Sequence, residues 1–153
     1  METTLVEQPP KPEYANFRQP RPESPEGKNY REFTLEAPVD DFVLARDDLG
    51  EYNSHYEKVA SDKGRTNLLH FRTTDRKLGN KTVLQIEELQ SDFLQAVNKK
   101  RRKEKDFTGR VALEDSYISS GIRQILQLAA REGYDSVSFP TGLDIAGLYN
   151  TEL

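Results

Sequence analysis

Polar and apolar residues are interleaved along residues 29–37 (NYREFTLEA), as expected of a β-strand with one buried face. The apolar positions of this stretch are Tyr30, Phe33 and Leu35. Pro38 follows and disfavours continuation of the strand, because its nitrogen cannot donate a hydrogen bond. The pattern predicts a short strand that ends at this proline.

Two further stretches rich in β-forming residues, 67–74 (NLLHFRTT) and 82–89 (TVLQIEEL), lie close together in the chain. Between them stand Gly79 and Asn80, which tolerate positive φ and are typical of tight turns. The two stretches and the turn predict a β-hairpin.

The spacing of apolar residues over 115–132 predicts an amphipathic helix. Its predicted inward stripe consists of Ile118, Ile122, Ile125, Leu126 and Ala129. Gly133 suits the position just after the helix, where a left-handed backbone is common. Residues 134–139 (YDSVSF) are then expected to form a strand, and residues 143–149 a last helix.

A second helix is expected to begin after Ser91, whose hydroxyl can accept a hydrogen bond from the first helical amides. Asp92 suits the positive end of the helix dipole, and the helix would continue into residues 99–105. Residues 40–65 lack periodicity and are expected to form a long loop, with one helical turn near residues 52–59.

These elements predict an α+β fold, in which an antiparallel, hairpin-containing sheet has helices packed on one side. Six of the eight prolines fall within residues 1–28, among charged residues. Such a segment buries too little apolar surface to offset the entropy lost on ordering it. We therefore expect a disordered, Pro-rich arm over residues 1–28 and a single α+β domain over residues 29–153.

The composition excludes several classes of site. The chain of 153 residues has no cysteine, which rules out disulfides, thiolate zinc sites and cysteine nucleophiles, and favours a reducing compartment. It shows neither a signal peptide nor an apolar run near the ~18 residues of a membrane span, so we expect no membrane partner. Motifs for nucleotide, dinucleotide or metal binding are missing, so no cofactor and no metal are predicted.

Polar groups are concentrated where the hairpin is expected to meet the helix that follows it. The binding residues predicted there are Glu87, Glu88, Gln90, Ser91 and Asp92. Strand alternation sends Glu87 and Glu88 to opposite faces, so that at most one of them projects into a given site. The structural alternative is that Glu87 faces solvent, Ser91 caps the helix and Asp92 complements its dipole.

Three basic side chains are expected to face this segment across the hairpin, namely His70, Arg72 and Arg76. Histidine can act as a general base near neutral pH, and arginine can hold a phosphate or carboxylate with two hydrogen bonds. The alternatives are a structural histidine and plain cross-strand ion pairs. The catalytic candidates are therefore Glu88, His70 and Arg72.

Two other segments offer contacts for an anion. Thr141 and Gly142 follow the last predicted strand, where they can cap a helix or present amides to an anion. The run Lys99–Lys105 (KKRRKEK) has six basic residues in seven, which suits either a solvated helix end or a contact with phosphate groups of nucleic acid.

The segments KNYREFTLEAP, LLHFRTTDR, VLQIEELQSDF and AAREGYDSVSFPTG occur in an order that resembles a domain of phage and mobile-element large polyvalent proteins. That domain carries a GENYRE strand, an HIRFNDR-like strand, a VLFIEEIQSDW junction and a late GYD…TG strand. The resemblance covers roughly residues 28–149 and departs at Phe93, Leu94 and Pro140, where the family has Trp, often His, and an aromatic residue. It implies a viral or mobile-element origin and a place in the bacterial host cytoplasm, by expression there or by delivery from the virion, and it implies no reaction.

We therefore expect a phage or mobile-element accessory protein, of the kind used in counter-defence, that binds a host or viral protein without catalysing a reaction. The alternative is a compact NAD-dependent enzyme of the ADP-ribosyltransferase kind, with His70 or Arg72 holding the nicotinamide ribose. Such enzymes also use a glutamate or glutamine late in the chain, and no glutamate follows the GYD strand before Glu152. A second alternative is nucleic-acid binding through Lys99–Lys105. The third is a metal-dependent nuclease that uses Asp75, Glu87 and Glu88.

Overall fold

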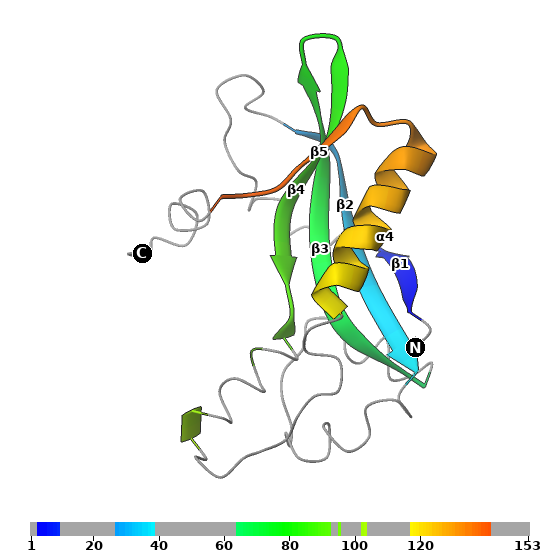
Figure 1. Ribbon diagram of the computed structural model, residues 1–153, viewed down its shortest axis with the longest axis vertical. Coiled ribbons are helices and arrows are strands. Elements are labelled where there is room, and N and C mark those ends of the chain that lie inside the picture. The colour runs from blue at the N-terminus through cyan, green and yellow to red at the C-terminus, as the bar shows by residue number, and fades with distance from the viewer. Residues whose placement is uncertain are drawn as a thin grey trace. The chain divides into compact units, whose positions relative to one another are not determined.

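The computed structural model describes residues 3–9, 27–38, 64–92, 95, 102–103 and 117–141. Within these residues, five strands and one long helix follow one another as shown in Figure 1. Their bounds are Thr4–Gln8 (β1), Lys28–Pro38 (β2), Arg65–Leu78 (β3), Lys81–Gln90 (β4), Tyr117–Glu132 (α4) and Ser136–Ser138 (β5). The strands form one sheet in the order β1-β2-β3-β4-β5.

This sheet corrects the predicted α+β arrangement of several helices packed on one side of an antiparallel sheet. The hairpin of β3 and β4 is confirmed, and Gly79 in its turn has a φ of 61°. However, β4 also pairs in parallel with β5, with Leu84 opposite Val137. The described part of the chain is therefore a five-stranded mixed sheet with one long helix. A parallel pair needs a long crossover between its strands, and no local pattern in the sequence records such a pairing.

The predicted disordered arm is wrong for its first residues, because residues 4–8 (TLVEQ) form β1 beside β2. Leu5 and Val6 favour a strand, and the prolines of this segment begin only at Pro9. The rest of the arm, over residues 10–26, lies outside the described residues, so the division at residue 28 stays a prediction.

Other predictions also fall outside the described residues. They are the loop over 40–65 apart from its last two residues, the helical turn at 52–59 and the last helix at 143–149. The predicted strand over 29–37 is confirmed as β2, which ends at Pro38.

The chain divides into two compact units. The first comprises Met1–Val6, Thr34–His70 and Gln90–Arg123, and the second comprises Glu7–Phe33, Phe71–Leu89 and Gln124–Leu153. In the first unit, a Cβ atom on Gly121 would stand only 2.6 Å from Cδ2 of the buried Leu69. Glycine at this position of α4 therefore permits the close approach of helix and strand.

In the second unit, aromatic and aliphatic side chains build the core. Phe33 of β2 and Phe71 of β3 stack with their ring centroids 5.0 Å apart, and the Arg31 guanidinium lies 4.9 Å from the Phe33 ring. The fully or nearly buried aliphatic residues of this unit are Leu84, Ile86, Ile125, Leu128 and Ala129. Helix α4 thus contributes its Ile125 side to the same core as the strands.

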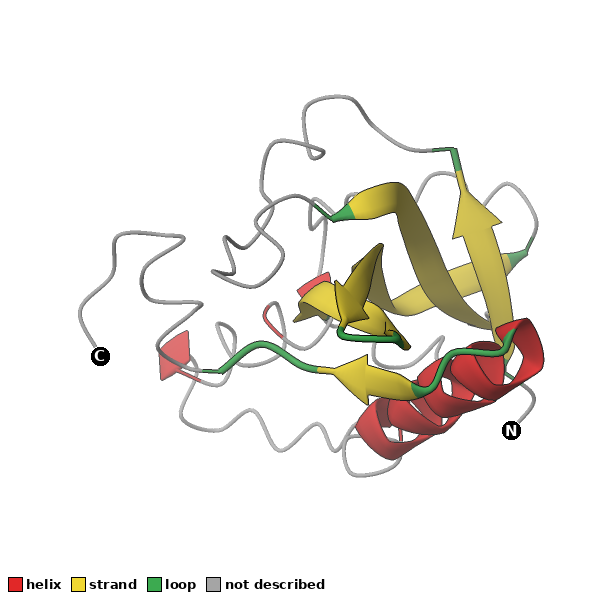
Figure 2. Ribbon diagram, turned by 90° about the horizontal axis from the view of Figure 1, so that it is seen from above, coloured by secondary structure: helices red, strands yellow, loops and turns green. Residues whose placement is uncertain are grey.

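The end of α4 has the geometry of a Schellman motif. The Tyr134 amide donates to the Ala129 carbonyl at 3.0 Å, and the Gly133 amide donates to the Ala130 carbonyl at 3.3 Å. Gly133 has a φ of 79°, so its predicted place just after the helix is confirmed. Figure 2 shows the chain turning from this point into β5.

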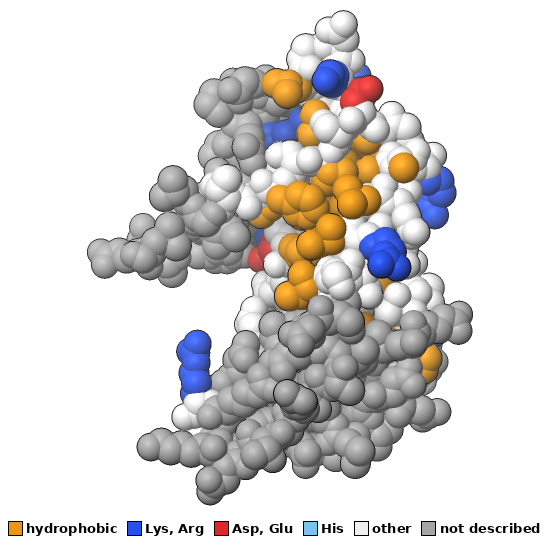
Figure 3. Space-filling model, viewed as in Figure 1, with side chains coloured by type: hydrophobic (Ala, Val, Ile, Leu, Met, Phe, Trp, Pro, Cys, Tyr) orange, Lys and Arg blue, Asp and Glu red, His pale blue; other side chains and the backbone are white. Residues whose placement is uncertain are grey.

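The predicted inward stripe of α4 is correct for two of its five residues. Ile125 and Ala129 are buried as expected, but Ile118, Ile122 and Leu126 are 44%, 37% and 51% exposed. Figure 3 shows apolar side chains gathered on the face of the molecule that it presents. Helical spacing permits two neighbouring apolar stripes on α4, and only the packing decides which of them is buried.

Two isoleucines of α4 allow the buried and the exposed stripe to be compared, because Ile125 belongs to the first and Ile122 to the second. We expect Ile125→Ala to lower the free energy of unfolding by about 2–4 kcal/mol, because it leaves a cavity in the core. The matched control Ile122→Ala removes a side chain that is 37% exposed and should cost less than about 1 kcal/mol. Urea denaturation followed by circular dichroism measures both, and equal losses would contradict this assignment of faces.

Candidate functional site

The predicted arginines belong to a row of polar side chains on β3 in the second unit. Arg72, Thr74 and Arg76 are alternate residues of this strand, so their side chains share one face of the sheet. All three are at least 95% buried. This face therefore carries cations where a strand face in a core usually carries apolar groups.

Both predicted glutamates bind this row. Glu87 Oε1 accepts hydrogen bonds from Thr74 Oγ1 and, at 2.8 Å, from Arg76 Nη2. Glu88 Oε2 lies 2.6 Å from Arg72 Nη2. Both carboxylates therefore contact side chains of this row, although strand alternation predicts that Glu87 and Glu88 leave β4 on opposite faces.

Tyr30 of β2 extends the same cluster. Its hydroxyl donates to Glu32 Oε1 at 2.9 Å. Burial raises the pKa of Tyr30, and the hydrogen bond and charge of Arg72 oppose this rise. The sequence interpretation missed Tyr30 and Glu32, although they occupy alternate positions of β2 and so share a face of the strand.

The two glutamates of this cluster differ in how much of their side chains solvent can reach. The Glu87 side chain is fully buried, so the predicted alternative in which it faces solvent is wrong. Glu88 retains 16% of its side-chain exposure and is the only one of the two that a ligand can touch without rearrangement. Charges removed from water to this degree are tolerated only when they are paired, and these pairs meet that requirement.

Four other residues of the predicted site lie in the first unit. His70 Nδ1 is 3.9 Å from Asp92 Oδ2, and both side chains are more than 90% buried. Gln90 Nε2 donates to Asp92 Oδ1 at 2.8 Å, and Ser91 Oγ donates to the Leu68 carbonyl. The predicted site thus resolves into a His70–Asp92 contact in one unit and glutamate–arginine pairs in the other.

The helix expected after Ser91 begins as predicted. The Ser91 carbonyl accepts a hydrogen bond from the Gln95 amide at 3.1 Å, which is the spacing of a first helical turn. Of the basic run that should follow, the structure describes Arg102 and Lys103, which are helical and exposed. Thr141 is exposed after β5, and Gly142 lies outside the described residues.

The structure does not assemble the carboxylates expected of a nuclease. Asp75 bonds with Asn29 and Tyr134, whereas Glu87 and Glu88 bond with arginines. Asp75 also follows Thr74 directly in β3 and therefore points to the other face. Among the described residues, no group of three or more histidine or carboxylate side chains is close enough to hold a metal ion.

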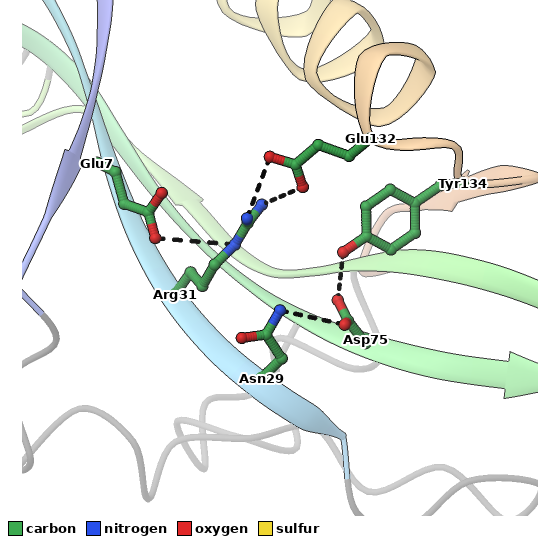
Figure 4. A network of polar contacts seen from close by, with 6 residues as sticks. All are labelled: Glu7, Asn29, Arg31, Asp75, Glu132 and Tyr134. Atoms are coloured by element: carbon green, nitrogen blue, oxygen red, sulfur yellow. Dashed lines mark hydrogen bonds and ion pairs between the residues drawn. The ribbon is translucent and has the colours of Figure 1, made fainter.

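Sequence reasoning missed a second polar network in the second unit (Figure 4). Arg31 donates to both carboxylate oxygens of Glu132 at 3.1 and 2.8 Å, and its Nε lies 4.0 Å from Glu7 Oε1. Asn29 Nδ2 donates to Asp75 Oδ2 at 3.2 Å, and the Tyr134 hydroxyl donates to Asp75 Oδ1.

Backbone geometry places two members of this network. Asn29 has a φ of 52°, a left-handed conformation that asparagine tolerates better than most residues. Tyr134 follows the Schellman turn, and burial together with the Asp75 carboxylate raises its pKa, so its hydroxyl keeps the proton that it donates. The GYD segment of the sequence was a signal for this turn, but nothing in it identifies Asp75 as the partner.

In comparisons with known proteins, no family model, no curated protein and no solved structure matches the chain. The resemblance to large polyvalent proteins therefore stays a prediction. In the part of the chain that the structure describes, no helix is long and apolar enough to cross a membrane.

The two kinds of ion pair in the second unit allow a matched test. We expect Glu87→Gln to lower the free energy of unfolding by about 3–5 kcal/mol, because Arg76 stays buried without its counter-charge. The same substitution at Glu132, which is 30% exposed and pairs with Arg31, should cost at most about 1 kcal/mol. Chemical denaturation measures both losses.

A double variant serves as the control for this result. Replacing both Arg76 and Glu87 by methionine removes the two charges together and should recover most of the stability that Glu87→Gln loses. If Glu87→Gln is as stable as the unaltered chain, the buried pair contributes nothing and the structural role assigned to Glu87 is wrong.

Proposed function

We propose that this chain is a phage or mobile-element accessory protein that acts in the bacterial host cytoplasm as a non-enzymatic interaction module for a host or viral protein. The observation that carries the proposal is the row of aliphatic side chains on α4. Ile118, Ile122 and Leu126 repeat every four residues and are each more than a third exposed. A solvent-facing helix surface is ordinarily polar, whereas apolar residues at this spacing are typical anchors of helix recognition.

The state of the predicted site residues supports the same proposal. A general acid or nucleophile must reach its substrate, but Glu87 is fully buried and accepts two hydrogen bonds from the fold. Glu88 and Arg72 are 2.6 Å apart, so either one would have to leave the other before it could act. These polar groups pair β4 with β3 and so stabilise the sheet.

The alternatives have less support. For an NAD-dependent transferase, Arg72 would have to exchange Glu88 for the ribose, and His70 is more than 90% buried beside Asp92. Nucleic-acid binding through residues 99–105 rests on the charge of that run, of which Arg102 and Lys103 are exposed.

A photocrosslinking amino acid at position 122, introduced while the chain is expressed in a bacterial host, tests the proposal. We expect a saturable crosslink to one protein, because a docking face brings the partner within reach of this side chain. The control places the same amino acid at position 80, in the exposed hairpin turn, and should give no such product. The products are identified by mass spectrometry.

A thermal-shift panel with NAD, single- and double-stranded oligonucleotides and divalent metals tests the alternatives. A ligand at a hundredfold its Kd stabilises the folded state by about 2.7 kcal/mol, which for a chain of this length raises the melting temperature by roughly 5–10 °C. We expect no shift. A shift with NAD that Glu88→Gln abolishes, or a shift with oligonucleotide that replacing Arg102 and Lys103 by glutamine abolishes, together with no crosslink from position 122, would show that the interaction-module proposal is wrong.

A further inference from the structure

The exposed row of α4 has a defined geometry, because its members lie on one continuous helix. Ile118, Ile122 and Leu126 are separated by four residues each and therefore stand one above another along one side. The neighbouring stripe, which includes Ile125 and Ala129, is buried in the fold. The row is thus bounded by the protein on one side and by solvent-facing residues on the other.

The charge beside this row is positive. Arg123 is exposed and stands three residues before Leu126, a spacing at which helical side chains are neighbours. Residues 117–131 contain no aspartate or glutamate, and Glu132 forms a two-bond ion pair with Arg31. This helix therefore presents apolar side chains and cations, in a chain whose net charge is −4.

We propose that α4 docks an amphipathic helix of another protein, one that carries its own apolar row and a carboxylate beside it to pair with Arg123. This inference rests on the proposed function and adds the chemistry of the partner. The aliphatic row supplies the contact area, and the ion pair sets the orientation and excludes basic partners.

Two other occupants fit the same face less well. In a symmetric dimer each copy would offer this surface to itself, so Arg123 would approach the equally basic helix of its partner copy. An anionic membrane would attract Arg123, but helices that lie in membranes combine a wide apolar face with many cations, and this chain is acidic overall. The positive charge of Arg123 beside the apolar row favours an acidic protein segment.

A display selection with the whole chain as bait tests this chemistry. The probe is a library of 16-residue helical peptides, randomised at the seven positions of one face and selected for binding to the unaltered chain. We expect the enriched peptides to carry apolar residues spaced by three or four and at least one aspartate or glutamate beside them. Ile122→Ser should weaken their binding at least tenfold.

Charge reversal on the same helix provides the decisive comparison. Arg123→Glu should weaken an enriched acidic peptide at least tenfold and should favour the version of that peptide with lysine in place of its acidic residue. The matched control is Arg131→Glu, since Arg131 follows Ile122 by nine residues, or two and a half turns, and so lies on the other side of α4. It should change the binding less than twofold.

Each other outcome overturns the inference. No enrichment, enriched peptides without acidic residues, or equal effects of the two charge reversals would refute an acidic helical partner. Binding to phosphatidylglycerol vesicles but not to peptides would assign the face to a membrane, and a dimer in sedimentation that Ile122→Ser dissociates would assign it to a second copy. A protein crosslink from position 122 that persists alongside any of these results would leave the proposed function standing and reject only the chemistry inferred for the partner.

Discussion

The pairing of buried charges between β3 and β4 is the constraint on which the second unit depends. From Phe71 to Arg76, β3 alternates between a core face and a face that carries two buried arginines. The effective penalty for removing an ion from water is several kcal/mol in a folded protein, so each arginine needs a carboxylate within contact distance. Glu87 and Glu88 meet this need, at 2.8 and 2.6 Å. A slip of β4 by one residue would separate charges from their partners, so the pairs also select the register of the hairpin.

This constraint explains the density of polar groups that made the EELQSD segment stand out. The sequence interpretation took the concentration of polar groups in this segment as an argument for a binding site. The number of donors facing the segment answers that argument, because Arg72, Thr74 and Arg76 each bond with one of its two glutamates. An excess of acceptors in sequence is therefore no sign of a vacant site until the donors on the neighbouring strand have been counted.

The features that could be predicted from the sequence are those that neighbouring residues decide. Gly79 and Asn80 determine the turn, Pro38 ends β2, and Gly133 closes α4 with a left-handed backbone. Each of these depends on conformations open to one or two residues, and such preferences act whatever the rest of the chain does.

The predictions that were wrong concern features that depend on contacts between distant segments. The parallel pairing of β4 with β5 cannot be predicted from the residue pattern of either strand, because β5 is only three residues long. For α4, the stripes centred on Ile122 and Ile125 are equally apolar, and the closeness of Gly121 to Leu69 selects the orientation. Predicted site residues contact one another within each unit, but whether they form a binding site is still a prediction, because it depends on burial, which the order of residues does not reveal.

The distribution of polar and apolar groups also bears on how strongly the α4 row can bind. Fully burying an aliphatic side chain contributes about 1.5–3 kcal/mol, and these three side chains are already about half buried. Their further burial therefore offers on the order of 2–4 kcal/mol, while association costs roughly 4–15 kcal/mol in lost rotational and translational freedom. The row alone is too small to hold a partner tightly. A stable complex must add the ion pair at Arg123 and contacts beyond the helix, so the row acts as the anchor that positions a larger interface.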